Sequence, residues 1–284
     1  MTLAGSQTAA VSFDPYAPYG AVIESTVRVV EWNVWGRYGD WAGRQAGIEG
    51  VLAGVEPDIV CLVESWASPE GRQVDLVGAR LGFEHRVFVG DWEQDGWTSG
   101  IGIVSRWPIA RQERCSLPGD GGDGHGDAVL VNIDGPRGMI DVVVVALDYP
   151  LGAGALRQQQ VRRLAEFVAA TGNGRHALVL CGDFNAGPDS DELRMLTGQA
   201  ATAVPGLVFY DAWDIGGDGT PGHTWSNRNP LAAPALWPDR RIDHILSAWP
   251  RAHGAGHPTA CELLGAGHEP PLSDHHGIVA DLRY

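Results

Sequence analysis

The stretch "LVLCGDFNAG", residues 178–187, decides the fold. Its apolar run from Leu178 to Cys181 has the length and composition of a strand that is covered on both faces. The run stops at Gly182, and Asp183 and Asn185 then follow two positions apart. Residues two apart on a strand face the same side, so this carboxylate and this carboxamide can converge on one point. A carboxylate can hold a metal ion or a water molecule, and a carboxamide can donate to a phosphate oxygen without adding negative charge, so the pair suits an anionic phosphoester.

Other apolar runs end with polar residues in the same way. A lone carboxylate after a buried run, as at Glu64 after "DIVCLV" (58–63), is costly unless it is paired or bound to a metal. Asn33 stands near the end of "VRVVEWNV" (27–34), and Asp243 in "RRIDHIL" (240–246) is embedded between the apolar residues Ile242 and Ile245. Asp274 and His275 in "PLSDHHGIV" (271–279) come just before the last predicted strand. Polar residues at the ends of several strands predict one site at the edge of a sheet. The ligands on offer are oxygen atoms and histidine without a thiolate cluster, which favours Mg²⁺ or Mn²⁺ as the cofactor.

The rest of the chain has many strand patterns and few helices. Apolar residues at i, i+3, i+4 and i+7 from Ile48 predict an amphipathic helix that ends near Val55. Further helices are predicted at 156–168 and at 190–196, the second with Ser190 as its N-cap. Strands are predicted at 27–34, 58–64, 85–90, 100–105, 128–133, 139–147, 177–181, 241–247, 259–264 and 277–284. This order favours packed sheets with helices outside, in a single domain over 26–284 that follows an irregular arm at 1–25.

Bulk composition limits the class of partner and the compartment. The 284 residues carry a net charge of −15, which disfavours tight non-specific binding to duplex DNA. The charge does not exclude a phosphorylated substrate, because bound metal ions can invert the local field. The four cysteines form no CxxC pair, and the chain shows neither a signal-peptide pattern nor an apolar run of the ~20 residues that cross a membrane. We therefore expect a cytoplasmic protein without a membrane partner or an obligate protein partner.

Taken together, the motifs resemble those of the endonuclease/exonuclease/phosphatase superfamily, which has the DNase I-like fold. The resemblance covers about residues 27–284 and rests on "EWNVW", "LVESW", "GIGIVSRWPI", "CGDFNAGPDS", "HTWSNRNP", "RRIDHI" and "SDHHGIV". It implies an α/β (α+β) fold of two packed mixed β-sheets flanked by helices, a four-layer sandwich. It does not name the substrate, since members cut DNA, RNA, abasic sites, phosphoinositides, sphingomyelin and small phosphoesters.

The resemblance also implies roles for the residues that could hold a metal and a water molecule. Glu64 resembles the principal Mg²⁺ ligand, and Asn33 resembles the neighbour that helps to bind metal and phosphate. Asp274 resembles a further acid of the metal site. Asp183 resembles the carboxylate that positions or deprotonates the attacking water.

The same resemblance assigns residues to the phosphoryl group. Asn185 resembles the side chain that orients and stabilises it, and His275 resembles the histidine of an Asp–His pair whose acid is Asp243. The implied reaction is in-line attack of water on phosphorus, with the metal stabilising the developing charge. The leading hypothesis is a Mg²⁺-dependent phosphoesterase acting on a phosphodiester or phosphomonoester, and the first alternative is an endonuclease on nucleic acid.

One motif departs from the family. Many relatives carry a histidine at the end of a central strand, where this chain reads "VVVVALDYP" (142–150). One register places Ala146 at that position and the DNase-type register places Asp148 there, so neither supplies an imidazole. The departure raises a second alternative, a catalytically impaired binding protein with the same fold.

The loop "HTWSNRNP" (223–230) and the basic pair that follows it are candidates for substrate contact. Trp225 and Asn227 are predicted to lie near the site, and Arg241 or its neighbour Arg240 could meet a phosphate. A purely structural loop held by its own Asn side chains is the alternative.

Overall fold

The structure, a computed structural model, describes residues 14–119, 126–171, 178–248 and 252–284. The predicted arm at 1–25 therefore lies partly outside the described residues, and its described part, 14–25, contains no helix or strand.

Two mixed β-sheets form the centre of the molecule, as the motifs predict. The first sheet has the order β12-β13-β1-β2-β5-β4, with β3 paired to β2, and consists of β1 (Thr26–Asn33), β2 (Ile59–Ser68), β3 (Gly71–Arg72), β4 (His85–Gln94), β5 (Trp97–Ser105), β12 (Pro258–Leu264) and β13 (Gly277–Arg283). The second has the order β10-β11-β9-β8-β7-β6 and consists of β6 (Ile109–Ser116), β7 (Asp127–Gly135), β8 (Gly138–Ala146), β9 (Leu178–Asp183), β10 (Phe209–Asp211) and β11 (Asp243–Ala248). Each sheet contains one parallel pair, β1 with β2 and β8 with β9, and the other pairs are antiparallel.

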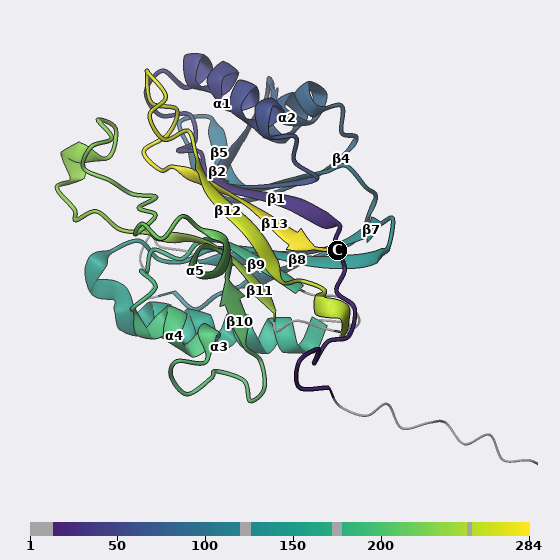
Figure 1. Cartoon of the computed structure of the whole chain (residues 1–284). Coiled ribbons are helices and arrows are strands. Elements are labelled where there is room, and N and C mark those ends of the chain that lie inside the picture. The colour runs from purple at the N-terminus through teal and green to yellow at the C-terminus, as the bar shows by residue number, and fades with distance from the viewer. Residues whose placement is uncertain (1–13, 120–125, 172–177, 249–251) are drawn as a thin grey trace, which may run out of the picture.

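Helices cover the outer face of each sheet. They are α1 (Trp41–Val55) and α2 (Gln73–Leu81) on the first sheet and α3 (Gly154–Thr171) and α4 (Asp191–Thr197) on the second. The short α5 (Ala212–Gly216) instead packs Ala212 and Trp213 into the cluster between the sheets. The described residues also form the 3₁₀ turns η1 (Leu151–Ala153), η2 (Ala233–Ala235) and η3 (Ala252–Gly254). Figure 1 shows α1 and α2 on one side of the paired sheets and α3 and α4 on the other. The order helix, sheet, sheet, helix is the predicted four-layer sandwich.

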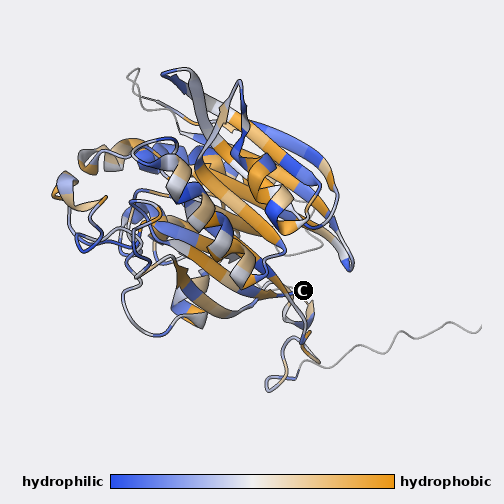
Figure 2. Cartoon of the chain, turned by 90° about the horizontal axis from the view of Figure 1, so that it is seen from above, coloured by the Kyte–Doolittle hydropathy of each residue, from blue (hydrophilic) through white to orange (hydrophobic). Residues whose placement is uncertain are grey.

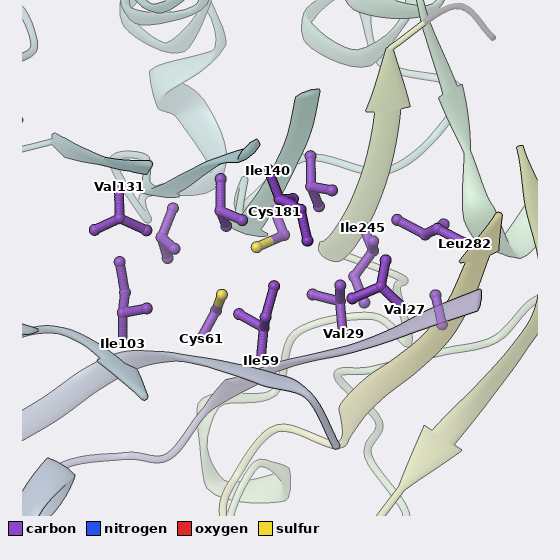
Figure 3. Packing of buried hydrophobic residues seen from close by; sticks show 14 of the residues in the cluster. Val27, Val29, Ile59, Cys61, Ile103, Val131, Ile140, Cys181, Ile245 and Leu282 are labelled. Carbon is purple, nitrogen blue, oxygen red and sulfur yellow. The ribbon is translucent and has the colours of Figure 1, made fainter. Parts of the chain in front are cut away.

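The largest apolar cluster fills the space between the sheets. Alternation along β1 sends Val27 and Val29 inward, and alternation along β9 does the same for Cys181. Figure 3 shows the inward side chains of both sheets packed together, with Cys61 of β2 among them. The opposite faces of the same strands pack on the helices, which explains why these strands are apolar throughout and why apolar residues concentrate in the sheets (Figure 2).

The local signals for helix ends are also present. The Ser190 hydroxyl accepts from Leu193 N at 3.3 Å and caps α4, as the sequence predicts. Asp40 caps α1 in the same way, accepting from Gly43 N at 3.2 Å. No helix in the described ranges is both long and apolar enough to cross a membrane.

The strand directions bring the ends of strands from both sheets together on one side of the molecule. The parallel strands β1, β2, β8 and β9 all end there. Because β13 runs antiparallel to β1 and β11 antiparallel to β9, these two strands begin there. In the second sheet Asp183 pairs in register with Ala146 on one side and with Asp243 on the other. The predicted strand 241–247 accordingly starts two residues later, at Asp243.

Candidate active site

A cleft of about 600 Å³ opens at this shared edge. Five of the predicted site residues line it, namely Glu64, Asp183, Asn185, Asp274 and His275, and so do Ala146, Asp148 and Trp225. Asn33 and Asp243 lie directly against these residues and are 1 % and 0 % exposed. The structure therefore brings the seven motif residues into one place.

The cleft continues the layer between the sheets. Asn33 lies two positions after Glu31 and four after Val29 on the inward face of β1, and Asp183 lies two positions after Cys181 on β9. The inward side chains are apolar along most of each strand and become polar at the last positions. This change explains why the motifs place polar residues after apolar ones. The alternation that directs apolar side chains into the core also directs these polar side chains into the cleft.

Glu64 reaches the cleft through an irregularity in β2. The pairing of β2 with β5 shifts between Leu62 and Ser65, and Glu64 has a φ of 52°. A non-glycine residue in the left-handed region is uncommon and is held there by its surroundings, here by Gly36 N donating to the Glu64 carbonyl at 3.0 Å. The bulge turns a side chain that would otherwise face α1 and α2 toward the cleft.

Asn33 links the two halves of the site. Its amide nitrogen donates to Glu64 Oε1 at 3.0 Å and to Asp183 Oδ2 at 3.2 Å, while its oxygen accepts from Trp35 N at 3.1 Å. In this orientation Asn33 holds two carboxylates in position and presents no oxygen to them. A direct contact between its oxygen and a metal would require the amide to rotate.

The "GDFN" segment has a specific local geometry. Gly182 has a φ of 139°, and a Cβ at this position would lie 1.9 Å from the Val145 carbonyl oxygen, so only glycine allows β9 to approach β8 this closely. Asn185 N donates to Asp183 Oδ1 at 2.8 Å, and the Asn185 amide donates to the Leu147 carbonyl at 2.9 Å. These bonds fix both side chains at the strand end.

His275 and Asp243 form the pair that the resemblance implies. His275 Nδ1 lies 2.8 Å from Asp243 Oδ2, and its Nε2 lies 3.9 Å from Asp183 Oδ2. Trp225 packs edge-on against the imidazole, with ring centroids 5.1 Å apart and planes at 77°. A buried carboxylate on Nδ1 requires that nitrogen to carry a proton, which directs Nε2 toward Asp183 and the cleft.

Burial and mutual repulsion shift the acids strongly. Burial, helped by the charge of Asp243, raises the pKa of Asp183 to about 7, and burial with the charge of Glu64 raises the pKa of Asp274 to about 6. Burial opposes a charged His275, but the carboxylates around it, first of all Asp243, raise its pKa well above the usual value. The protein without bound ions therefore holds protons at this site near neutral pH.

A divalent cation fits this arrangement. Among the described residues that line the cleft only His275 is basic, while four carboxylates line it, those of Glu64, Asp148, Asp183 and Asp274, and Asp243 lies beneath. Ligand atoms of Asp183, Asp243 and His275 lie within 4.8 Å of one another. Because Asp243 and His275 are already bonded to each other and buried beneath the cleft surface, we take the carboxylates of Glu64 and Asp274 as the better first ligands. Oxygen donors of this kind suit Mg²⁺ or Mn²⁺.

Arg241 and Asn227 do not line the cleft. Arg241 is 4 % exposed and forms ion pairs with Asp211 and, at 2.6 Å, with Asp214 on a separate hollow of about 450 Å³. The expectation that Arg241 meets a phosphate therefore needs correction, because two carboxylates already neutralise its guanidinium. The Asn227 side-chain amide donates to the Trp237 carbonyl within its own loop. This contact corresponds to the alternative of a purely structural loop held by its Asn side chains.

Arg240 is the basic residue that remains available near the site. Its Nη1 lies 3.4 Å from the Asn185 carbonyl, its guanidinium packs over the Trp237 ring at 5.4 Å, and its Nε and Nη2 are buried without a partner. It forms no ion pair with a carboxylate in the described part of the chain.

Sequence reasoning missed a residue that organises the site from below. Arg44 of α1 is 6 % exposed and donates to five backbone carbonyls, those of Val34, Trp35, Gly36, Tyr38 and Leu272. These carbonyls belong to the segment after β1 and to the segment before Asp274. A single arginine within a helix pattern carries no signal for this role, because its partners are backbone groups far away in sequence.

Comparison with known proteins agrees with this geometry. A sequence model of the Endonuclease/Exonuclease/phosphatase family matches residues 30–275. The comparison with curated proteins returned no significant match.

Solved structures of related fold are similar over most of the chain. Danio rerio TDP2 complexed with a single-strand DNA product has a TM-score of 0.73 at 18 % identity, covering 92 % of this chain and 100 % of that one. The endonuclease/exonuclease/phosphatase from Beutenbergia cavernae DSM 12333 has a TM-score of 0.68 at 22 % identity, covering 91 % and 72 %. The human Nocturnin catalytic domain with a bound sulfate anion has a TM-score of 0.66 at 20 % identity, covering 92 % and 96 %. At these identities the structural likeness establishes the fold.

Proposed function

The chain belongs to the Endonuclease/Exonuclease/phosphatase family, and on that premise we propose that it is a divalent-metal-dependent hydrolase of phosphoesters. The observation that carries the proposal is the concentration of buried carboxylates at one cleft, whose described lining contains one basic residue, His275. Such a cluster is costly in a folded protein unless a cation and an anionic substrate complete it. We take Mg²⁺ or Mn²⁺ as the cation, in accord with the oxygen donors.

Glu64 and Asp274 are the residues that would hold the ion, with Asn33 fixing Glu64 through its amide. When bound, the ion would supply Lewis-acid stabilisation of negative charge on the phosphoryl oxygens. It would also favour the ionised forms of the acids around it, Asp183 and Asp274 in particular.

Asp183 is the residue that we assign to the attacking water. Its Oδ1 is occupied by Asn185 N, so Oδ2 is the atom that faces His275 and the cleft. In its ionised form this oxygen can orient a water molecule and take a proton from it as phosphorus is attacked. The group lies at a strand end with two fixed hydrogen bonds, which is the rigidity that positioning requires.

His275 and Asn185 supply donors to the phosphoryl group. Asp243 keeps His275 in one orientation and stabilises its protonated form, so that Nε2 can donate toward an oxygen that gains charge during the reaction. The Asn185 amide spends one hydrogen on the Leu147 carbonyl and has one left for the substrate.

Ala146 and Asp148 both border the cleft, but they differ in freedom. Ala146 is partly exposed and lies opposite Asp183 in the sheet. The Asp148 carboxylate is 6 % exposed and accepts from the Gln160 amide, while its own N–H donates to Gln160 Oε1 at 3.1 Å. Asp148 is thus held by α3, and position 146 is the one where a side chain would enter the site. The alternative of a catalytically impaired binding protein stays a prediction, and a measurement of hydrolytic activity tests it.

The test is turnover of a chromogenic bis-phosphodiester and of a matched phosphomonoester with Mg²⁺, with Mn²⁺ and with chelator. We expect hydrolysis that requires the metal and that falls at least a hundredfold in Asp183→Ala. Arg241→Gln is the matched control for a buried charge outside the cleft, and its effect on unfolding is measured alongside. Metal-dependent turnover that survives in Asp183→Ala would refute the assignment, and the absence of turnover on every phosphoester would support the binding protein.

A further inference from the structure

Aromatic side chains form much of the wall of the cleft. Six of the residues that line it are aromatic: Trp35, Tyr38, Trp92, Tyr149, Trp225 and Trp237. Trp225 is 7 % exposed and belongs to the packing around His275, whereas Trp92 is 47 % exposed and Tyr149 is 61 % exposed. Large apolar surfaces of this kind, left open beside a catalytic centre, mark a surface that binds something.

Trp92 and Tyr149 come from different sheets. Trp92 lies in β4 of the first sheet and pairs in register with Ser99, which also lines the cleft. Tyr149 lies three residues beyond Ala146, where β8 of the second sheet ends. Each ring therefore belongs to one side of the opening that the two sheets form.

The position of Tyr149 is supported from behind. Its ring stacks on Trp237 with centroids 6.3 Å apart and planes at 23°, and Trp237 packs in turn on Trp225 at 5.5 Å and beneath the Arg240 guanidinium. An exposed ring that rests on a fixed ring loses little freedom when a ligand covers its other face. Such a preformed surface is what base or aryl recognition needs.

The charge of the cleft argues against a long polyanion as the partner. No arginine lines the cleft in the described ranges, the chain contains no lysine, and the net charge is −15. Binding along a nucleic-acid backbone requires several phosphate contacts from basic side chains. One phosphoryl group at the metal site and one ring on the wall is the recognition that these residues can supply.

The distance between the two elements suits a small substrate. Tyr149 lies three positions after Ala146, which faces Asp183, so its Cα can lie no more than about 11 Å from that strand end, and its ring stays within a side-chain length of that limit. A sugar or a short linker spans a separation of this order between a phosphate and a ring.

We propose that Trp92 and Tyr149 form a binding site for one planar aromatic ring of the substrate, so that the enzyme acts on small phosphoesters that carry such a ring, as a mononucleotide does. The inference rests on the proposed function, because it takes the phosphoryl group to lie at Asp183 and His275. It goes beyond that function by naming the class of organic group that is recognised.

The experiment compares two non-hydrolysable ligands by titration calorimetry with Mg²⁺ present. They are the phosphonate analogues of adenosine monophosphate and of ribose 5-phosphate, in which carbon replaces the ester oxygen, so they share the anionic group and differ by the ring. The variants are Trp92→Ala and Tyr149→Ala, with Trp92→Phe and Tyr149→Phe as ring-preserving controls. Tyr16→Ala, which removes a 97 % exposed ring outside the cleft, is the surface control.

We expect the wild-type protein to bind the adenosine analogue at least about fivefold more tightly than the ribose analogue, since one base stacked on an aromatic side chain contributes that much or more. Each alanine variant should reduce this preference about fivefold or more, while the phenylalanine variants and Tyr16→Ala should keep it. Equal binding of the two ligands, absence of binding by both, or equal loss for both in the alanine variants would overturn the inference.

Two further measurements separate this inference from the proposed function. If the protein hydrolyses a chromogenic diester with metal but binds both phosphonates equally, the inference is wrong and the proposed function stands. If it prefers the adenosine analogue but hydrolyses no phosphoester, the proposed function is wrong and the ring-binding site stands. Binding of a single-stranded decanucleotide more tightly than the adenosine analogue, with a steep loss at higher salt, would refute the small substrate in favour of a nucleic acid.

Discussion

Replacing Asp183 by Asn should make the metal-free protein more stable at pH 8 and no more stable at pH 4. Asp183 is 4 % exposed, and its pKa is raised to about 7 by burial, the charge of Asp243 and other groups. A carboxyl group whose pKa is higher in the folded state than in the unfolded chain binds its proton more tightly when folded. Its ionisation therefore destabilises the fold progressively from the unfolded pKa of 3.8 to about pH 7 and in full above it.

The size of the effect follows from the same two values. A pKa of about 7 in place of 3.8 corresponds to roughly 4 kcal/mol at pH 8, and this is an upper figure because the charges of Asp243 and His275 beside Asp183 also change with pH. Asn at 183 would still accept from Asn185 N, but its amide would face the Asn33 amide, which costs about 1–2 kcal/mol. The net gain is about 2–3 kcal/mol, or roughly 4–8 °C in the melting temperature.

Thermal unfolding of both proteins from pH 4 to pH 8, with chelator and then with Mg²⁺, measures this. The Asn variant should melt higher than the wild type at pH 8 with chelator, and this advantage should be lost toward pH 4, where only the cost of the misplaced amide remains and the variant should melt slightly lower. Mg²⁺ should stabilise the wild type more than the variant and narrow the gap. A variant that is less stable than the wild type at pH 8 with chelator, or a difference that does not change with pH, would refute the reasoning.

Four other substitutions test three separate parts of the site. Glu64→Gln keeps the volume but loses the charge that a hard cation needs, so titration calorimetry should show at least about tenfold weaker Mg²⁺ binding with little change in metal-free unfolding. Arg44→Lys replaces the planar guanidinium, which donates to five carbonyls, by an ammonium group with three donors. It should lower the free energy of unfolding in urea by about 2–4 kcal/mol and should also lower kcat. An unchanged free energy of unfolding would show that the carbonyl contacts are dispensable. Ala146→His should raise diester turnover about tenfold to a hundredfold if the new imidazole makes a charge-assisted hydrogen bond in the transition state. If the register that places Asp148 at the family's histidine position is correct, Asp148→His should raise turnover instead. Steady-state kinetics on both variants distinguishes the two registers.

The predictable part of the fold is the part where one physical signal dominates. Strands covered on both faces, such as β2 and β9, appear as continuous apolar runs and were located within a few residues. The edge strand β6 was not predicted because most of its residues are exposed and three of its eight residues are charged, so neither alternation nor an apolar run marks it. Helix α2 was missed as well, since Gln73 and Asp75 interrupt the apolar pattern of its short length.

The site was predictable to the extent that it depends on strand direction. Polar residues at strand ends indicated Asp183, Asn33 and Asp243, because alternation carries Asp183 and Asn33 from the core into the cleft and Asp243 begins the strand that pairs with Asp183. Glu64 was named for its motif, but its orientation depends on a β-bulge that no local pattern reveals. The choice between Arg240 and Arg241 could not be made either, because it depends on Asp211 and Asp214, which lie about thirty residues earlier in the chain.

Buried acids at the cleft make the fold less stable than apolar residues would, and a purely structural role would not require them. Glu31, one step below Asn33 on β1, is 0 % exposed with no partner for either oxygen, and burial with the charges of Asp243 and Asp183 raises its pKa well above the ordinary value. An apolar residue there would continue the row of Val27 and Val29 at no such cost. A neutral acid beneath two charged ones limits the repulsion that a further ionised group would add. Acids that stay this close are therefore best understood as a site prepared for a cation, because a bound cation would offset the repulsion that destabilises the metal-free site.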